Sequence, residues 1–289
     1  MILLFQQILN GILIGSVYSL MALGLTLIYG ILHIPNFAHG NKYMWGAFIS
    51  LTLVGVFKLN YWLAILLSMA ILAGIGLLVE RFIFRPLQDQ PHINSFIAAI
   101  GLLLLLEGVA FAIWGGEWQR FPFAYRQNLN FFGITITLHR LLVIGVTALL
   151  IILLQLFIKK TTWGWTIEAV AQDRQGAQLV GVNVYLVSSM AFAIGTALAA
   201  AASSLVAPIY LVYPAMGSLP LIKAFVVIIL GGMGSLPGAV IGGYLLGLIE
   251  SLAGGYLSMV YADLLAFAVL VTVLAIKPTG LFGKKAEGT

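Results

Sequence analysis

Only a few side chains in this 289-residue chain could carry out chemistry, because charged residues make up 8% of it and cysteine is absent. The first candidates for metal binding are His33 and His39, which flank a turn containing Pro35. Six residues apart on a loop with no carboxylate nearby, they lack the ligand spacing of a zinc site. We therefore expect no metal. We interpret His39 as a polar group that lines an internal path, or else as an ordinary loop histidine with a hydrogen-bond partner.

Nucleotide-binding motifs are also missing. The sequence has no GxxxxGK[ST] segment, so we expect no P-loop for ATP. The run Gly232-Met233-Gly234 starts like a dinucleotide-binding fingerprint, but it fails at Pro237 and follows no βαβ pattern. No catalytic cluster is recognisable either. The sequence therefore predicts a protein that is not an enzyme and that binds no cofactor of its own.

Ionisable residues inside apolar segments are rare, and such residues usually face the interior of a bundle. Glu107 lies in the middle of the run LLLLLEGVAF, where it could contact a substrate or bond a neighbouring helix, and we favour the second role. Lys223 and Glu250 lie near segment ends and could reach the membrane surface. Asp263 lies near a helix start, where a carboxylate is favourable. No line of such residues crosses the membrane, which argues against a proton relay.

Charge is concentrated in a polar island, residues 159–184, between two long apolar runs. Because charge is costly in hydrocarbon, this island must lie in water. Residues 163–181 within it have the pattern of a short helix. A membrane protein with one long, structured loop on one side is expected to dock another molecule there.

The surrounding elements are membrane helices. Apolar residues make up 62% of the chain and the mean hydropathy is +1.09, far above that of soluble domains. Nine apolar segments can be drawn, and a helix of about 20 residues crosses the hydrocarbon core. They are 6–31, 43–57, 61–80, 95–114, 139–158, 185–207, 219–230, 238–252 and 258–276. We predict an all-α transmembrane bundle of eight or nine segments in one domain, residues 1–289.

The distribution of Lys and Arg predicts the orientation of these segments. Basic residues occur in the loops 81–94 and 159–184 and in the tail, at Lys277, Lys284 and Lys285. The positive-inside rule places these regions, including the C-terminus, in the cytoplasm. With nine spans the N-terminus is then outside, and with eight it is inside. The scattered net charge of +5 indicates no nucleic-acid partner, and the first ten residues lack the basic start of a cleavable signal peptide.

The loop 115–138 is predicted to be external. Its aromatic residues would form an interfacial belt or an outer surface. They are Trp118, Phe121, Phe123 and Tyr125, with Trp114 at the preceding helix end.

Two segments, 43–57 and 219–230, are short, and Gly- and Pro-rich stretches interrupt the chain next to them. Paired interruptions of this kind in the two halves of a transporter indicate the substrate path. We therefore expect 35–40 and 223–234 to approach one another near a central cavity. The alternative is that both stretches are ordinary surface loops. The candidate pathway residues are Asn36, Phe37, His39, Gly40, Lys223, Gly231, Gly232 and Gly234.

The order of these blocks resembles the permeases of branched-chain amino-acid ABC importers, in particular the LivH type. The resemblance runs nearly end to end: GSVYSLMALGLTLIYG, IPNFAHG, RPL at 85–87, AVAQDRQGAQLVGVNV, the stretch 223–250, and KPTGLFG at 277–283. It implies a LivM-type second permease, two cytoplasmic ATPases that bind ATP, and an external amino-acid-binding protein. It also implies a multi-pass protein of the bacterial inner membrane.

The same resemblance implies that the polar island docks on the ATPase. The coupling residues would be Glu168, Ala169, Gln172, Asp173, Arg174 and Gly181. Glu168-Ala169 is similar to the EAA element of importer permeases, but Val170 replaces its third residue. The family usually has an acidic residue after NFAHG, where this chain has Asn41. The implied activity is ATP-driven uptake of branched-chain or other neutral amino acids. The alternatives are an importer of urea or short amides and, from another class, a channel for a small neutral solute.

Overall fold

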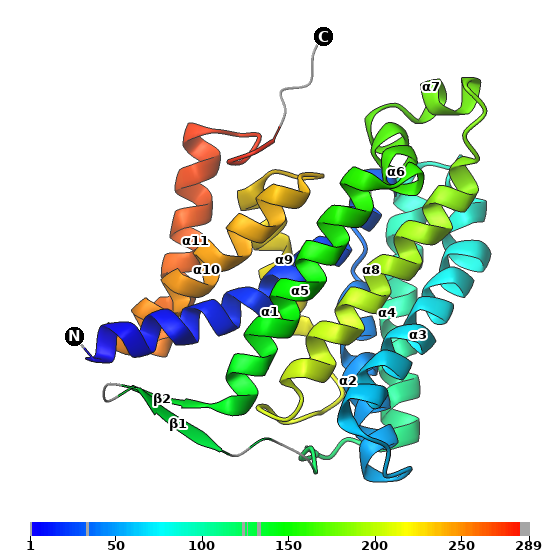
Figure 1. The fold of residues 1–289 in the computed structure, drawn as a ribbon. Helices are drawn as coiled ribbons and strands as arrows, with labels where there is room; N and C mark the ends of the chain where they lie inside the picture. The colour runs from blue at the N-terminus through cyan, green and yellow to red at the C-terminus, as the bar shows by residue number, and fades with distance from the viewer. Residues whose placement is uncertain (1, 33–34, 123–124, 126, 132–133, 284–289) are drawn as a thin grey trace.

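The computed structural model describes residues 2–32, 35–122, 125, 127–131 and 134–283 (Figure 1). Four residues named above, His33, Phe123, Lys284 and Lys285, lie outside the described residues.

Within the described residues, nine helices of 14 to 31 residues correspond one to one with the nine predicted segments. They are α1 (Ile2–Leu32), α2 (His39–Gly55), α3 (Tyr61–Val79), α4 (His92–Trp114), α5 (Leu138–Lys160), α8 (Val184–Val206), α9 (Ser218–Gly231), α10 (Leu236–Tyr256) and α11 (Met259–Ile276). Six stretches are long and apolar enough to cross a membrane: α1, Tyr61–Leu87, α4, α5, α8 and α10. The all-α membrane fold predicted from the sequence is therefore confirmed.

Shorter elements connect these helices. After α3 come a π-helical turn, η1 (Glu80–Phe84), and a 3-10 turn, η2 (Arg85–Leu87). The polar island forms α6 (Thr162–Gln172) and α7 (Arg174–Leu179). The loop 115–138 contains an antiparallel hairpin of β1 (Asn128–Phe131) and β2 (Ile134–Thr137). The sequence analysis predicted no strands in this loop, because strands of four residues are too short for a clear alternation signal.

The bundle has two ends, which we call the hairpin end, with β1 and β2, and the α6–α7 end (Figure 1). The N-terminus of α1 lies at the hairpin end, where the Gln6 side chain donates a hydrogen bond to the Thr135 carbonyl. The other end of α1 reaches α6, because a Cβ atom on Gly30 would lie 3.7 Å from that of Ala171. The residues after α11 bond the last turn of α9, from the Phe282 N–H to the Gly231 carbonyl. The first and last described stretches thus lie at opposite ends of the bundle, as in the nine-segment alternative.

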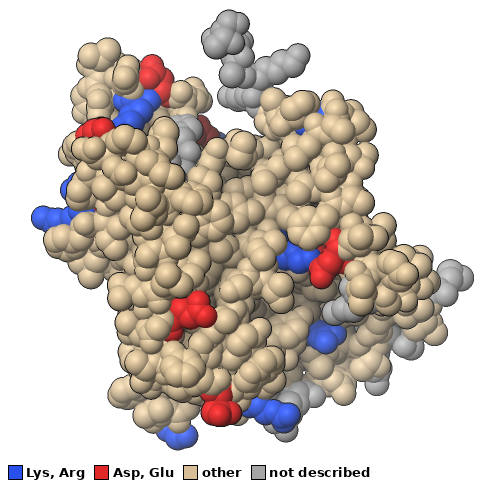
Figure 2. Space-filling model, turned by 180° about the vertical axis from the view of Figure 1, so that it is seen from behind, with Lys and Arg blue, Asp and Glu red and all other residues tan. Residues whose placement is uncertain are grey.

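Helix starts follow the local sequence. The side chain of Asn60 accepts a hydrogen bond from the Trp62 N–H at the start of α3. Asn183 and Ser235 cap α8 and α10 in the same way. Such side chains satisfy backbone N–H groups that have no partner within the helix. Charged side chains are sparse on the face shown in Figure 2, as expected for a surface in contact with hydrocarbon.

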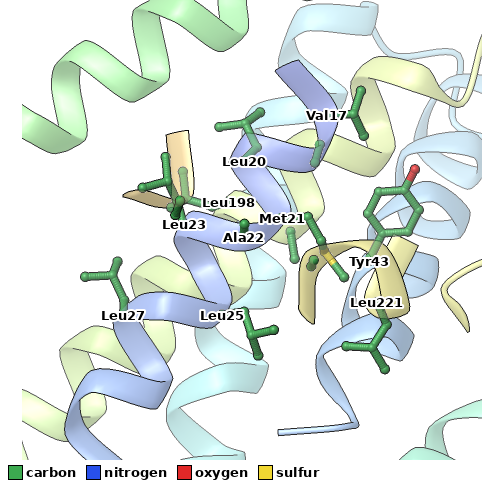
Figure 3. Close-up of a cluster of buried hydrophobic side chains, with 14 of the residues drawn as sticks. Val17, Leu20, Met21, Ala22, Leu23, Leu25, Leu27, Tyr43, Leu198 and Leu221 are labelled. Carbon is green, nitrogen blue, oxygen red and sulfur yellow. The ribbon is translucent and has the colours of Figure 1, made fainter. Parts of the chain in front are cut away.

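Helix α1 forms the centre of the core and is buried on more than one face. In Figure 3, Met21 lies on the side of Tyr43 of α2, whereas Leu27 points away from it. Helix α10 runs antiparallel along α1 and contacts it through glycines: a Cβ atom on Gly11 would lie 2.9 Å from the Leu248 Cα. Small residues at such contacts let two backbones approach closely, which drives helix association in membranes.

If the chain is divided after α7, α1 is the first helix of the first half and α8 is the first helix of the second. These two helices cross at another pair of glycines. A Cβ atom on Gly24 would lie 2.5 Å from the carbonyl oxygen of Gly195, and one on Gly195 would lie 2.6 Å from that of Gly24. Helix α3 packs along α8 much as α10 packs along α1, with the Thr196 hydroxyl bonding the Leu72 carbonyl at 2.9 Å. The crossing therefore brings the backbones of α1 and α8 into close contact, while each of the two helices also packs along a helix from the other half.

We predict that Gly24→Ala lowers the stability of the bundle by about 1–3 kcal/mol, because the new methyl group has no room beside the Gly195 carbonyl. Gly145→Ala on α5 is the matched control, since a Cβ atom there meets nothing within 4 Å. The measurement is the thermal unfolding midpoint of both variants in lipid nanodiscs. Equal midpoints would contradict the close crossing.

Candidate functional site

Two half-length helices meet with their N-termini opposed inside the bundle. Helix α2 has 17 residues and α9 has 14. A Cβ atom on Gly40 would lie 2.6 Å from the carbonyl oxygen of Gly217, and one on Gly217 would overlap the Gly40 carbonyl. From this contact, which we call the junction, α2 runs to the hairpin end and α9 to the α6–α7 end. The two short segments noted in the sequence therefore belong to one feature.

The junction lies at depth and not at the surface of the bundle. The imidazole of His39 lies 3.1 Å from the position that a Cβ atom would take on Gly24. Gly24 precedes the end of α1 by eight residues, which is about 12 Å of helix. The ring of Phe37 packs against Phe225 at 5.1 Å and against Phe96 at 5.3 Å between centroids. These contacts enclose the non-helical backbone before α2, as hydrocarbon requires.

Three polar side chains next to the junction are buried without a hydrogen-bond partner among the described residues, as is Thr26 of α1. The three are Asn36, His39 and Lys42. The Lys42 side chain is 0% exposed, and its Nζ lies 5.0 Å from the centroid of the Phe192 ring. A cation–π contact of this kind offsets only part of the cost of burying an ammonium group. The sequence analysis missed Lys42 because it placed the start of the apolar segment at residue 43.

A cavity of about 910 Å³ lies in the hairpin-end half of the bundle. Its walls come from α1, the loop 207–217 and the facing parts of α9, α10 and α11. Tyr43 and Pro220, each three residues past a junction glycine, are among its lining residues, so the cavity extends down towards the junction. Its aromatic lining consists of Tyr18, Tyr43, Trp118, Tyr210 and Tyr213, and its charged lining of Arg140, Lys223, Glu250 and Asp263.

Three of these charged side chains form one cluster on the cavity wall. The Lys223 Nζ donates to Glu250 Oε1 at 2.6 Å and to Asp263 Oδ1 at 2.5 Å. The Tyr18 hydroxyl donates to the other Glu250 oxygen at 2.8 Å. The Lys223 and Glu250 side chains are 8% and 10% exposed, whereas that of Asp263 is 64% exposed. The cluster thus consists of a buried ion pair, Lys223 and Glu250, and an exposed carboxylate, Asp263.

The sequence analysis did not connect these three residues: it placed Lys223 and Glu250 near segment ends and Asp263 near a helix start. The structure brings them together from three consecutive helices. Arg140 is a further charged lining residue that the sequence analysis did not single out, and it donates to the Asn10 side chain at 2.9 Å.

The candidate pathway residues named from the sequence do not all line this cavity. Lys223 lines it, whereas Asn36 and His39 are buried beside the junction. Gly231, Gly232 and Gly234 form the turn between α9 and α10 at the α6–α7 end, where Gly232 has a φ of 101°. Glu107 is half-buried on α4 and is not a lining residue of this cavity.

The polar island forms two helices, which corrects the single helix predicted over 163–181. Asp173 leaves the helical conformation, with φ of −148° and ψ of 103°, and its carboxylate accepts the Gln175 N–H to cap α7. Aspartate prefers this position to a helix interior. Ile167 and Val170 of α6 face the bundle. The exposed coupling candidates are Glu168, Ala169, Gln172, Asp173 and Gly181.

Arg174, the remaining coupling candidate, points back to the bundle. Its guanidinium donates to the Gln88 side chain at 2.8 Å and lies 3.7 Å from the Asp89 carboxylate. Gln88 in turn donates to Ser188 of α8 at 3.1 Å. The polar island is therefore tied to the turn after α3 and to α8.

At the centre of these contacts lies Glu80, whose side chain is fully buried. It accepts hydrogen bonds from the Arg85 guanidinium at 2.8 Å and from the Ser189 hydroxyl at 2.6 Å. A buried carboxylate requires such partners. The sequence analysis did not identify this network, because Glu80 and Ser189 are 109 residues apart.

Within the part of the chain that the structure describes, no group of three or more His, Cys, Asp or Glu side chains could hold a metal ion. The pair His33 and His39 cannot be compared with the structure as a pair, since His33 lies outside the described residues.

Comparisons with known proteins identify the family. The family model described as "Branched-chain amino acid transport system / permease component" matches residues 7–274. The chain belongs to this permease family. It is 34% identical to the high-affinity branched-chain amino acid transport system permease protein LivH of Escherichia coli, over 96% of this chain and 95% of that protein. It is 35% identical, with the same coverage, to the permease protein BraD of Pseudomonas aeruginosa.

An archaeal relative, the probable permease protein LivH of Methanocaldococcus jannaschii, is 32% identical over 96% of this chain and 92% of that protein. Among solved structures, PsaBC from Streptococcus pneumoniae in complex with Fab matches with a TM-score of 0.51 and 13% identity, over 93% of this chain and 91% of that one. This likeness shows the fold alone. The permease is thus a multi-pass membrane protein of a transport system, and its family is not one of enzymes.

We predict that Lys42→Met raises the thermal unfolding midpoint of the permease. A methionine side chain fills a similar volume and removes an ammonium group that is buried without a partner, which costs free energy. Lys160→Met, at an exposed position, is the matched control and is expected to leave the midpoint unchanged. A lower midpoint for Lys42→Met would mean that the ammonium group is stabilised in the bundle.

Proposed function

We propose that this permease is the transmembrane subunit of an ABC importer for branched-chain or other neutral amino acids. The observation that carries the proposal is the cavity that extends towards the junction of α2 and α9, in a chain of this family. Solute sites in transporters are commonly formed where half-helices meet near the middle of the membrane. The cavity would be the outer part of the pathway, and movement at the junction would open it towards the α6–α7 end.

The proposed energy source is ATP hydrolysis by two cytoplasmic ATPase subunits, because the sequence has no nucleotide-binding motif of its own. Transport against a gradient needs two states that a ligand or nucleotide stabilises to different extents. The exposed residues Glu168, Gln172 and Asp173 would dock on an ATPase, and Arg174 would pass the movement to Gln88 and α8. The hydrogen-bond network around Glu80 supports this route, since it ties the docking helices to the membrane helices.

The remaining proposed partners are a LivM-type second permease and an external binding protein that delivers the amino acid. The proposed location is the bacterial inner membrane, with the α6–α7 end in the cytoplasm. The basic residues of that end, among them Lys159 and Lys160, support the orientation. We further propose that residues 1–289 act as a single permease domain with the coupling loop 159–184.

The proposed substrate class rests on the family and on the cavity lining. Tyrosine and tryptophan rings, such as Tyr43 and Trp118, offer apolar area for a hydrocarbon side chain. The relatives from E. coli and P. aeruginosa are described as high-affinity branched-chain amino acid permeases. A urea or short-amide importer of the same architecture remains the second candidate from the sequence, and a solute channel without an ATPase the third.

We predict that a cysteine at Glu168 or Gln172 cross-links to an ATPase subunit in the assembled complex. Both side chains are exposed on α6, so a docked partner would lie within reach of a short bifunctional reagent. A cysteine at Glu117, an exposed residue near the hairpin end, serves as the negative control. Cross-links from position 117 and none from α6 would contradict the docking assignment.

We also predict that proteoliposomes with the whole complex and its binding protein accumulate labelled leucine when ATP is supplied, and that the permease alone does not. The reason is that the energy source lies in the partner subunits. Leucine, alanine, proline and urea should be compared under the same conditions. Uptake by the permease alone would favour the channel, and uptake of urea without amino acids would favour the amide importer.

A further inference from the structure

In the ion cluster on the cavity wall, the contact between Lys223 and Glu250 is buried, whereas the contact between Lys223 and Asp263 can be exchanged for another partner. Lys223 and Glu250 are both buried, and the Tyr18 hydroxyl occupies the second oxygen of Glu250. Breaking a buried, hydrogen-bonded ion pair is strongly unfavourable. Asp263 is 64% exposed, and the contact that it makes with Lys223 uses Oδ1. An exposed ion pair contributes little to stability, so it can be exchanged for another partner.

The cluster also carries an excess of negative charge. Two carboxylates and one ammonium group leave a formal charge of −1 at this point of the wall. The other charged lining residue, Arg140, bonds Asn10, which lies eight residues before Tyr18 on α1, or about 12 Å along the helix. The cluster is therefore suited to a ligand that brings a positive group of its own.

We propose that Lys223 and Asp263 bind the two charged groups of a zwitterionic α-amino acid, whose carboxylate pairs with Lys223 and whose ammonium group pairs with Asp263. The ligand enters between the two side chains and replaces their mutual contact with two new ones. Glu250 and Tyr18 hold Lys223 in place meanwhile. No covalent bond changes. The inference rests on the proposed function and assigns its substrate recognition to named residues.

This arrangement separates amino acids from the other candidate solutes by charge. Urea and short amides have neither a carboxylate nor an ammonium group, so they cannot compensate for the separated Lys223–Asp263 pair. A site that loses a charged hydrogen bond to a ligand discriminates strongly against that ligand. The side chain of the amino acid would then lie against the aromatic lining of the cavity, which gives no preference for a charged side chain.

The test is the binding of labelled leucine to the complex of permeases and ATPases in nanodiscs, trapped with ADP and vanadate and without the binding protein. For Asp263→Asn we expect a dissociation constant about tenfold or more above that of the unaltered protein, as for the loss of a hydrogen bond to a charged group. Asp263→Glu keeps the carboxylate and should restore most of the binding. Glu117→Gln, an exposed position outside the cavity lining, is the matched control.

Competition on the unaltered complex gives a second readout that does not depend on the folding of a variant. Valine should displace leucine, whereas 4-methylpentanoate, 3-methylbutylamine and urea should not, because each lacks at least one of the two charges. Displacement by any of these three at valine concentrations, or unchanged binding by a folded Asp263→Asn, would overturn the proposal. ATP-dependent uptake is measured separately. Its absence while leucine binding still depends on Asp263 would refute the importer function and leave the site standing.

Discussion

The structure depends on one constraint: a backbone polar group that faces hydrocarbon must have a partner within the protein. Long helices meet it by themselves, but the chain is interrupted before α2 and before α9. At the first interruption the His39 ring lies beside Gly24 of α1, and the close crossing of Gly24 and Gly195 brings α1 and α8 together. Larger side chains at the crossing or at Gly40 and Gly217 would separate the elements that cover the interruptions. These glycines are therefore needed for the helical backbone to be interrupted inside the membrane.

The same constraint governs the charged side chains. Glu80 is buried at the α6–α7 end and has Arg85 and Ser189 as partners, and Glu250 near the cavity has Lys223 and Tyr18. Each carboxylate links helices that are distant in sequence. One network lies where an ATPase is proposed to dock, and the other lies in the proposed solute path. Charges that a bilayer would exclude thus form contacts between elements that are distant in sequence.

The sequence predicted the helical segments well, because about 20 consecutive apolar residues have few other interpretations. It also indicated the two interrupted segments through their glycines and prolines. It could not show that Lys223 meets Asp263, since an ion pair between residues 40 positions apart leaves no local pattern. The division of the polar island at Asp173 was predictable in principle, since aspartate is a strong N-cap. The burial of Lys42 was not predictable, because it depends on packing against residues distant in sequence, such as Phe192 of α8.

The opposed N-termini of α2 and α9 have an electrical consequence. Each helix N-terminus acts as roughly half a positive charge, so the two together place about one positive charge at the junction, beside the buried Lys42. A positive potential at this point of the proposed pathway would repel protons and metal cations, as the half-helices of water channels do. A zwitterion has no net charge and would meet no such barrier. In the proposed transport cycle, the permease would then pass its solute without dissipating the cation gradient across its membrane.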